Sequence, residues 1–253
     1  MQEYSNKITL VKNSRGVYDI DTSKGCYYGT KDNKKGCYGE CYAARYSKAY
    51  GYNFNRTVLR HFESVDHVDQ IRKKLFNIDM PFVRIGVNGD PSEDWPHFIH
   101  IVNLIYGIRP IVVITKHWNT LTDSQLDMLA NYNLCINTSV SALDKPQQLK
   151  HRLEQYNRLK PYCKSVLRVV SCDFNKGNLK GVILNDIQES LFNNDLVLDN
   201  VLRVTTNNTY VKMGIINTTK EYFLTKEKLF SKYNKTTYTG NCDSCPDMCG
   251  INT

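Results

Sequence analysis

Short apolar runs alternate with longer amphipathic stretches along most of the chain. The apolar runs cover residues 81–87, 110–115, 135–140, 166–171 and 201–206, and shorter strand-like segments cover 7–11 and 16–20. Apolar residues recur at helical spacing over 58–76, 95–106, 122–132, 143–159 and 182–192, and residues 43–50 are compatible with a helix. The pattern predicts strands in the first set and helices in the second.

Strands that alternate with helices of ten or more residues indicate parallel βαβ crossovers, with the helices outside the sheet. Five or six such units predict an α/β fold, a partial (βα)6 TIM-like barrel over residues 1–221. A cysteine loop near the N-terminus and a cysteine-rich extension over 222–253 complete the predicted domain organisation. In such a barrel, active residues gather at the C-terminal ends of the strands.

Composition narrows the class of protein. The chain has 253 residues, of which 41% are hydrophobic and 23% charged, and its apolar runs are too short to span a bilayer. No basic segment followed by an apolar block opens the chain, so we expect a cytoplasmic protein in a reducing compartment. Clustered cysteines there favour a metal over disulfides.

The formal net charge of +8 would suit a nucleic-acid partner. The lysines are scattered, however, and no run of five like charges appears, so a solvated surface is the better interpretation of the charge. The sequence contains no phosphate-binding loop, no Ser/His/Asp order and no dinucleotide fingerprint. Hydrolase, kinase and dehydrogenase activities therefore have no support.

Six of the nine cysteines form two close-set trios, one near each end: Cys26, Cys37 and Cys41, and Cys242, Cys245 and Cys249. Two pairs of cysteines at this spacing could hold zinc and so join the two ends of the chain. Alternatively, three cysteines can bind a [4Fe-4S] cluster and leave one iron open to a small molecule. The trios thus predict two clusters or one shared site, whereas the remaining cysteines, Cys135, Cys163 and Cys172, are expected to be small core residues.

Three further groups of polar residues have two interpretations each. The acidic turn with Asp90 and Glu93 fits a ligand amine and equally a helix N-terminus. Lys116 and Trp118 follow a strand. There Lys116 would bind an anion and Trp118 would stack on a base or adenine, or both residues would simply belong to a surface loop. Arg168 would contact a ligand or form an ion pair with an acid such as Asp173.

The cysteine trio after the first strand, the following βα series and the turn NGDPSE resemble the radical S-adenosylmethionine (SAM) enzymes. That resemblance implies a [4Fe-4S] cluster on Cys26, Cys37 and Cys41, with SAM chelated by the open iron. The SAM contacts that it implies are Asn88, Gly89, Asp90, Pro91, Glu93, Ser139 and Arg168. The cysteine spacing is C-x10-C-x3-C, where those enzymes have C-x3-C-x2-C.

Together with the C-x2-C-x3-C of the tail, the pattern is also similar to cysteine-rich bacteriophage proteins of the gene-product-eighty-eight-like group. Two hypotheses follow. In the first, the chain is a radical-SAM-like iron-sulfur protein of the host cytoplasm that cleaves SAM and draws electrons from a reductant protein. In the second, it is a non-enzymatic zinc or iron-sulfur protein whose terminal cysteines share a structural metal, with a basic surface for nucleic acid or a protein.

Overall fold

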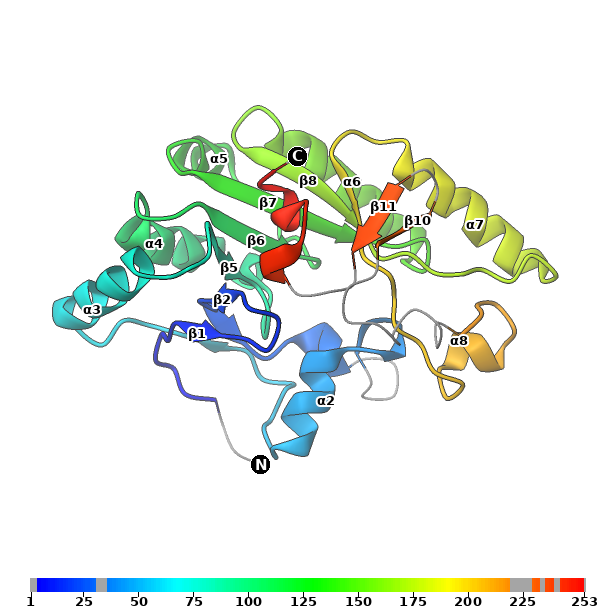
Figure 1. The fold of residues 1–253 in the computed structure, drawn as a ribbon, viewed down its shortest axis with the longest axis horizontal. Helices are drawn as coiled ribbons and strands as arrows, with labels where there is room; N and C mark the ends of the chain where they lie inside the picture. Colours follow the sequence, from blue (N-terminus) through cyan, green and yellow to red (C-terminus); the bar gives the residue numbers. More distant parts are fainter. Residues whose placement is uncertain (1–3, 31–35, 219–228, 233–234, 239–241, 253) are drawn as a thin grey trace.

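A mostly parallel sheet forms the centre of the computed structural model, which describes residues 4–30, 36–218, 229–232, 235–238 and 242–252 (Figure 1). Its seven strands lie in the order β1 (Val11–Lys12), β2 (Tyr18–Asp19), β5 (Val83–Ile85), β6 (Ile111–Thr115), β7 (Leu134–Val140), β8 (Lys164–Val169) and β9 (Val197–Asp199). Only β1 and β2 run antiparallel; the other neighbours are parallel. The predicted α/β class is confirmed, whereas this strand order does not by itself make the sheet a barrel.

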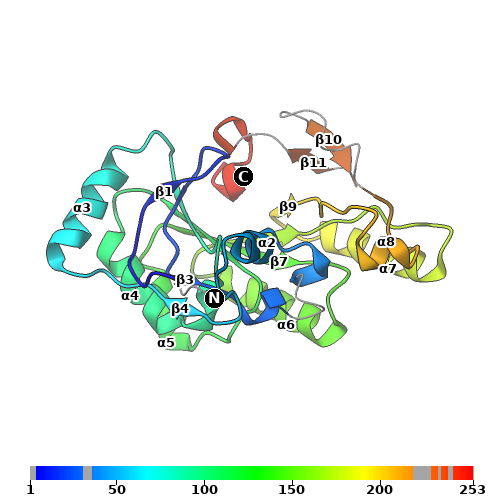
Figure 2. The same cartoon turned by 90° about the horizontal axis from the view of Figure 1, so that it is seen from below.

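Five helices connect successive parallel strands: α3 (Val65–Phe76), α4 (Trp95–Ile105), α5 (Asp123–Leu129), α6 (Pro146–Leu159) and α7 (Leu179–Phe192). In Figure 2, α4, α5 and α6 lie on one side of the sheet and the C-terminal segment lies on the other. Every residue of β7 is buried. Coverage of both faces explains why β6 reads as a nearly continuous apolar run instead of an alternating one.

Local capping fixes where several helices begin. Ser64 precedes α3 and accepts a hydrogen bond from the backbone N–H of His67. Thr122 and Gln125 form the capping box predicted at the start of α5. Because such caps satisfy N–H groups that have no partner inside the helix, they stop the helix from extending backwards.

The cap at Ser64 explains one wrong prediction. The expected helix over 58–76 begins only at Val65, and Val58–Leu59 instead forms β4, which pairs with β3 (Ser23–Lys24). The apolar spacing before Ser64 belongs to a strand and a loop. Helical periodicity in residues 58–62 was therefore coincidental.

The expected last strand over 201–206 is also wrong, because β9 occupies Val197–Asp199. The chain nevertheless continues alongside β8 after β9 ends. Asn200 N donates to Val169 O at 2.8 Å, and Leu202 N donates to Ser171 O at 2.8 Å. The apolar residues beyond β9 are thus buried in irregular backbone, which the apolar pattern alone does not distinguish from a strand.

The C-terminal extension returns to the sheet. After the hairpin of β10 (Leu229–Lys232) and β11 (Lys235–Tyr238), two short 3-10 turns cover Cys242–Ser244 and Met248–Gly250. Asn137 Nδ2, on β7, donates to Cys249 O at 2.9 Å. The tail therefore covers the face of the sheet opposite the helices, and the predicted domain boundary at 221/222 lies outside the described residues.

The loop after β5 requires glycine at its first position. Gly86 has φ +95°, and a Cβ there would lie 2.0 Å from the backbone oxygen of Ile114 on β6. We expect Gly86→Ala to lower the free energy of unfolding by about 3 kcal/mol, since a left-handed backbone costs roughly 1–2 kcal/mol and the steric clash adds to it.

Gly107→Ala is the matched control, because Gly107 has φ +81° and a Cβ there meets nothing within 4 Å. This variant should lose only the conformational part, roughly 1–2 kcal/mol. Urea denaturation of both variants measures the difference. Equal losses would show that β5 and β6 do not approach as closely as described.

Candidate metal centre

Asp21, just beyond β2, binds the loop that follows β5. Its carboxylate accepts hydrogen bonds from the backbone N–H groups of Gly86, Val87 and Asn88 at 3.2, 2.8 and 3.2 Å, and from the Asn88 side-chain amide at 2.9 Å. Three successive N–H groups directed at one carboxylate form a backbone anion site. The loop is thereby fixed beside the end of β2.

Asp90 makes the corresponding link from the same loop to β6. It is buried, and its carboxylate accepts from the Thr115 hydroxyl at 2.6 Å and from the backbone N–H groups of Lys116 and His117 at 2.8 and 2.9 Å. It also caps the turn Pro91–Glu93 by accepting from Ser92 N at 3.0 Å. Of the two interpretations of this acidic turn, the structure supports the helix-cap role for Asp90.

Protonation of this pair follows from burial. Burial alone would raise the pKa of Asp90, but nearby His117 and the hydrogen bonds from residues 115–117 hold that pKa below its usual value. Burial also lowers the pKa of His117 to about 4, so its imidazole is neutral at neutral pH. Asp90 is therefore an ionised structural acceptor whose lone pairs are already used, not an open contact for a ligand amine.

The N-terminal cysteine loop lies directly against this edge of the sheet. Gly25 N donates to Asn88 O at 2.9 Å, and Gly25 and Gly89 form a parallel bridge. A Cβ at Gly89 would lie 2.4 Å from Ser23 O, so these two segments of the chain approach too closely for a side chain at Gly89. Of the predicted SAM contacts, Asn88 and Gly89 thus position the cysteine loop.

Cys26 lies where β6 ends. Its Sγ is 3.1 Å from His117 Nε2, and the His117 ring stacks on Tyr28 with the ring centroids 3.9 Å apart. The backbone N–H groups of Tyr28 and Gly29 also point toward the Cys26 sulfur. These donors surround a sulfur that is otherwise buried.

The other two thiols of the trio lie nearby. Cys37 is within electrostatic range of both Cys26 and Cys41. Cys41 is the N-cap of α2 (Tyr42–Ala49), and the N–H groups of Ala43 and Ala44 point at its sulfur. Burial raises the pKa of all three cysteines, so the thiols are protonated unless a metal takes the place of the protons.

Chemically, the donor set fits a soft metal or an iron-sulfur cluster. Three partly buried thiols of one loop lie near one another, and backbone N–H groups are directed at two of the sulfurs, as they are around cluster thiolates. Within the described part of the chain, no three His, Cys, Asp or Glu side chains are arranged to hold a metal ion. Binding therefore requires the loop side chains to shift toward a common centre.

A buried charged network lies behind Cys37. Lys116 Nζ contacts the Tyr38 hydroxyl and is 3.2 Å from Asp144 Oδ1, while Arg152 Nη1 is 2.5 Å from Asp144 Oδ2. The two cations and one carboxylate leave one net positive charge. Although burial raises the pKa of Cys37, Lys116 and Arg152 act against that rise and so favour its thiolate.

The predicted role of Lys116 needs correction. The Lys116 ammonium is paired with Asp144, so it is not an open anion site. Trp118 is 2% exposed; its Nε1 donates to Thr138 Oγ1 at 3.1 Å and its ring packs against Trp95. Its φ of +51° turns the chain back so that the indole enters the core, and Trp118 also lines a cleft together with His117; stacking on a ligand stays a prediction.

The remaining predicted SAM contacts do not touch the trio in the described structure. Pro91 is buried in the capped turn, and Glu93 accepts from Thr57 Oγ1 at 2.6 Å. Ser139 and Arg168 are paired across β7 and β8, and Arg168 donates to Asn200 Oδ1 at 3.1 Å. That hydrogen bond takes the place of the alternative ion pair with Asp173.

The tail trio is a separate group. Cys242 lies within electrostatic range of Cys245 and Cys249, and of the guanidinium groups of Arg15 and Arg84. None of the interactions found for the described residues joins this trio to the N-terminal one. The alternative in which Cys37, Cys41, Cys242 and Cys245 share one zinc therefore gains no support from the contacts.

Sequence reasoning missed His117 as a neighbour of the cysteines. The available signal was its place directly after a predicted parallel strand, where site residues gather. It also missed the network of Tyr38, Asp144 and Arg152. Tyr38 and Asp144 are far from Lys116 in the chain, and only the fold shows that both contact it and that Arg152 pairs with Asp144.

Comparisons with known proteins add little. No protein-family model and no curated protein sequence matches the chain. Among solved structures, the chain is similar to the cobalamin-dependent S-adenosylmethionine radical enzyme OxsB with aqua-cobalamin bound, at 11% identity and a TM-score of 0.28. The match covers 79% of this chain and 26% of that one, and a TM-score this low does not establish a shared fold.

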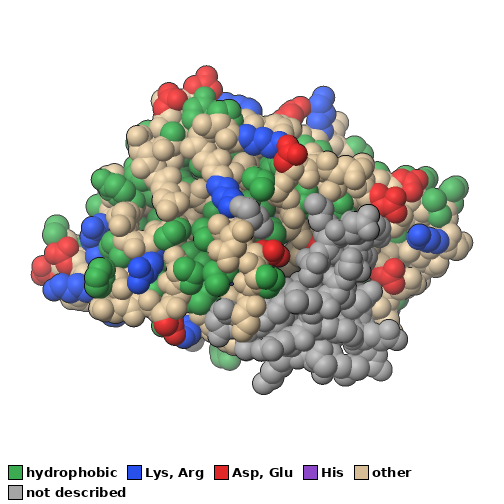
Figure 3. Space-filling view, turned by 45° about the horizontal axis from the view of Figure 1, so that its top comes forward, with side chains coloured by type: hydrophobic (Ala, Val, Ile, Leu, Met, Phe, Trp, Pro, Cys, Tyr) green, Lys and Arg blue, Asp and Glu red, His purple; other side chains and the backbone are tan. Residues whose placement is uncertain are grey.

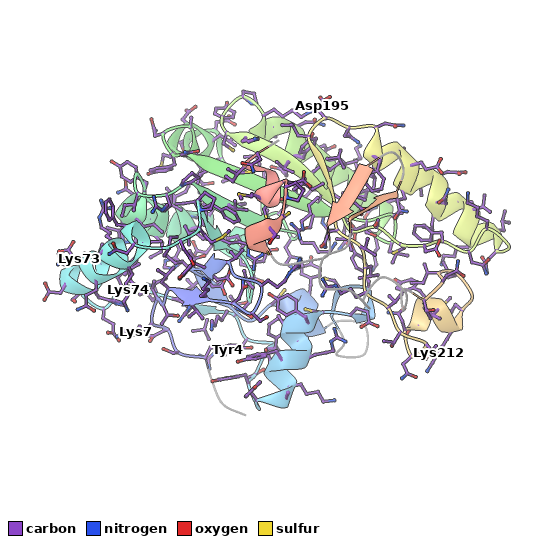
Figure 4. All side chains as sticks on the ribbon, in the orientation of Figure 1. Tyr4, Lys7, Lys73, Lys74, Asp195 and Lys212 are labelled. Carbon is purple, nitrogen blue, oxygen red and sulfur yellow. The ribbon has the colours of Figure 1, made fainter. Side chains whose placement is uncertain are left out.

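The surface carries its charge in dispersed form. On the face in Figure 3, Lys and Arg side chains stand apart from one another and alternate with acidic ones. In Figure 4, Lys7, Lys73 and Lys74 lie near one end of the molecule and Lys212 lies near the other. A nucleic-acid partner stays a prediction from net charge.

Among the described residues, no helix has the length and apolarity that crossing a membrane requires.

Asp90→Asn tests the link between β5 and β6. An amide keeps one acceptor but presents an NH₂ group to the N–H donors of residues 116 and 117, so we expect a loss of about 3 kcal/mol in the free energy of unfolding. Asp123→Asn, which removes a carboxylate 3.0 Å from Arg158 at an exposed position, should cost less than about 1 kcal/mol.

The contribution of Asp90 to the free energy of unfolding depends on pH. Because folding lowers the pKa of Asp90, its stabilisation is complete above the ordinary carboxyl pKa and is lost as pH falls through the lowered one. Denaturant midpoints measured from pH 7 down to pH 3 should fall more steeply for the wild type than for Asp90→Asn. Parallel curves would contradict the role assigned to this carboxylate.

Proposed function

We propose that the protein binds a [4Fe-4S] cluster through Cys26, Cys37 and Cys41 and binds SAM at the iron that these cysteines leave open. The observation that carries the proposal is the proximity of three partly buried thiols at the C-terminal edge of a parallel sheet, where α/β proteins place their ligands. The reaction class is reductive cleavage of SAM.

The surroundings of the trio suit a cluster ligated by thiolates. Lys116 and Arg152 offset negative charge next to Cys37, and backbone N–H groups face the sulfurs of Cys26 and Cys41. A bound cluster would supply one-electron reduction of SAM, with the electron coming from a reductant protein. The chain itself would hold the thiolates apart from water and orient the ligand.

A cleft beside Cys26 offers space for a small molecule. Its volume is about 280 Å³, and its lining includes Tyr28, His117, Asn119, Gln147, His151 and Arg152. His117 Nδ1 is buried and has no hydrogen-bond partner among the described residues. A hydrogen-bonding group of a ligand in the cleft would satisfy that nitrogen at a position next to the trio.

The test is anaerobic reconstitution of the full chain with iron and sulfide, followed by an assay for 5′-deoxyadenosine with SAM and a reductant. Cys37→Ser should reduce the product at least 100-fold, because it removes one of only three ligands. Cys172→Ser is the matched control: Cys172 is buried beside Gln188, outside the trio, and its loss should leave the product within twofold. Wild-type protein with a full cluster that neither binds nor cleaves SAM would contradict the proposal.

One observation favours a second candidate, a structural zinc site. His117 Nε2, at 3.1 Å from Cys26 Sγ, could complete a Cys3His set, a common structural zinc arrangement. Metal analysis after purification from an iron- and zinc-containing medium separates the two. A loss of one zinc ion per chain in His117→Ala would support the second candidate, whereas iron and sulfide per chain that stay unchanged in His117→Ala would support the cluster.

A further inference from the structure

A fourth buried thiol lies against the tail trio. Cys135 is the second residue of β7, and its Sγ is 3.5 Å from Cys249 O. The Asn137 side chain donates to the same carbonyl oxygen at 2.9 Å. Cys135 is therefore a core residue, as predicted, but its sulfur faces the segment that carries the tail cysteines.

The tail approaches this thiol through unusual backbone. Met248, Cys249 and Gly250 have φ values of +43°, +56° and +96° in succession. A Cβ at Gly250 would lie 3.1 Å from Cys135 Sγ and 2.8 Å from Val166 Cγ2. Two non-glycine residues in the left-handed region cost free energy, and such strain is typical of ligand-binding segments.

Charges around the four cysteines are suited to thiolates. Cys135 lies within electrostatic range of Cys249 and of the Lys164 ammonium, and Cys242 lies within range of Cys245, Cys249, Arg15 and Arg84. Asn137 Oδ1, two residues from Cys135, is buried without a hydrogen-bond partner among the described residues. A metal ion or cluster bound by these cysteines would offset the cost of the left-handed backbone. The nearby cations would balance the negative charge of the thiolates.

The site lies away from the N-terminal trio. Strand register places Cys135 beside Val112, near the start of β6, whereas His117 comes two residues after β6 ends at Thr115. Five residues separate the two levels, three along the strand and two beyond it, which corresponds to about 16 Å where the backbone is extended. One metal ion or one cluster does not span that distance.

We propose that Cys135, Cys242, Cys245 and Cys249 form a tetrathiolate metal site, separate from the N-terminal trio and taking zinc or an iron-sulfur cluster. Four protein ligands leave no open coordination position, so this centre joins the tail to β7 instead of binding substrate. The proposal goes beyond the function assigned to the N-terminal trio and does not depend on it. Among the described residues the free thiols are not arranged around a common centre, so metal binding requires the side chains of the tail and of Cys135 to move toward one another.

The experiment isolates this site by first removing the other. In the full chain with Cys26, Cys37 and Cys41 all changed to Ser, we expect zinc or iron to remain bound at one centre per chain after anaerobic purification. Adding Cys135→Ser to that variant should reduce the bound metal at least tenfold, or replace a four-sulfur Co²⁺ spectrum by a three-sulfur one in cobalt-loaded protein.

Adding Cys172→Ser instead, at a buried cysteine beside Gln188, should leave both the metal content and the cobalt spectrum unchanged. Cys135→Ala checks the result independently of the serine hydroxyl, and circular dichroism confirms that each variant is folded. Unchanged metal content and cobalt spectrum after Cys135→Ser would overturn the proposal, as would a triple variant that binds no metal. Neither result bears on SAM cleavage by the N-terminal trio.

Discussion

Two buried carboxylates, Asp21 and Asp90, hold together the edge of the sheet on which the candidate site depends. Loops after parallel strands expose backbone N–H groups that burial leaves without water, and each such group needs an acceptor. Asp21 supplies it for residues 86–88, and Asp90 supplies it for residues 116 and 117. The ends of β2, β5 and β6 are thereby fixed relative to one another, and the cysteine loop lies on that framework through Gly25 and Gly89.

Much of the fold could be predicted because its signals are local. The apolar runs of β6 and β7 and the capping box at Thr122 depend on residues that are close in the chain. Helix spacing over 58–76 misled because the cap at Ser64, not the apolar pattern, determines where α3 begins. Which elements pack against one another depends on contacts between residues far apart in the chain, and apolar periodicity does not indicate those contacts.

In the candidate site, too, residues with a local sequence signal were predicted and residues without one were not. The cysteine trios were visible from spacing alone, and Asp90 was correctly recognised as a possible cap. The burial of Trp118 was not predicted, because a positive φ turns its indole into the core and no sequence pattern indicates that turn. Lys116 contacts Tyr38 and Asp144 across separations of 28 residues or more, and Arg152 pairs with Asp144. This network could not be predicted from the sequence.

The two cysteine groups then have different settings. The N-terminal trio adjoins a cleft and an unsatisfied His117 nitrogen, which suits a centre that accepts a ligand. The tail trio covers the face of the sheet opposite the helices and meets Cys135 in a closed environment. In this account one centre performs chemistry at the strand ends, and the other anchors the tail.

Mössbauer spectroscopy of the ⁵⁷Fe-loaded full chain, recorded with and without SAM, tests the central claim most directly. A [4Fe-4S] cluster held by Cys26, Cys37 and Cys41 has one iron without a protein thiolate, so SAM should shift the signal of one iron in that cluster and leave the other three unchanged. A spectrum that SAM does not alter, or protein that takes up no iron at the N-terminal trio, would contradict the account.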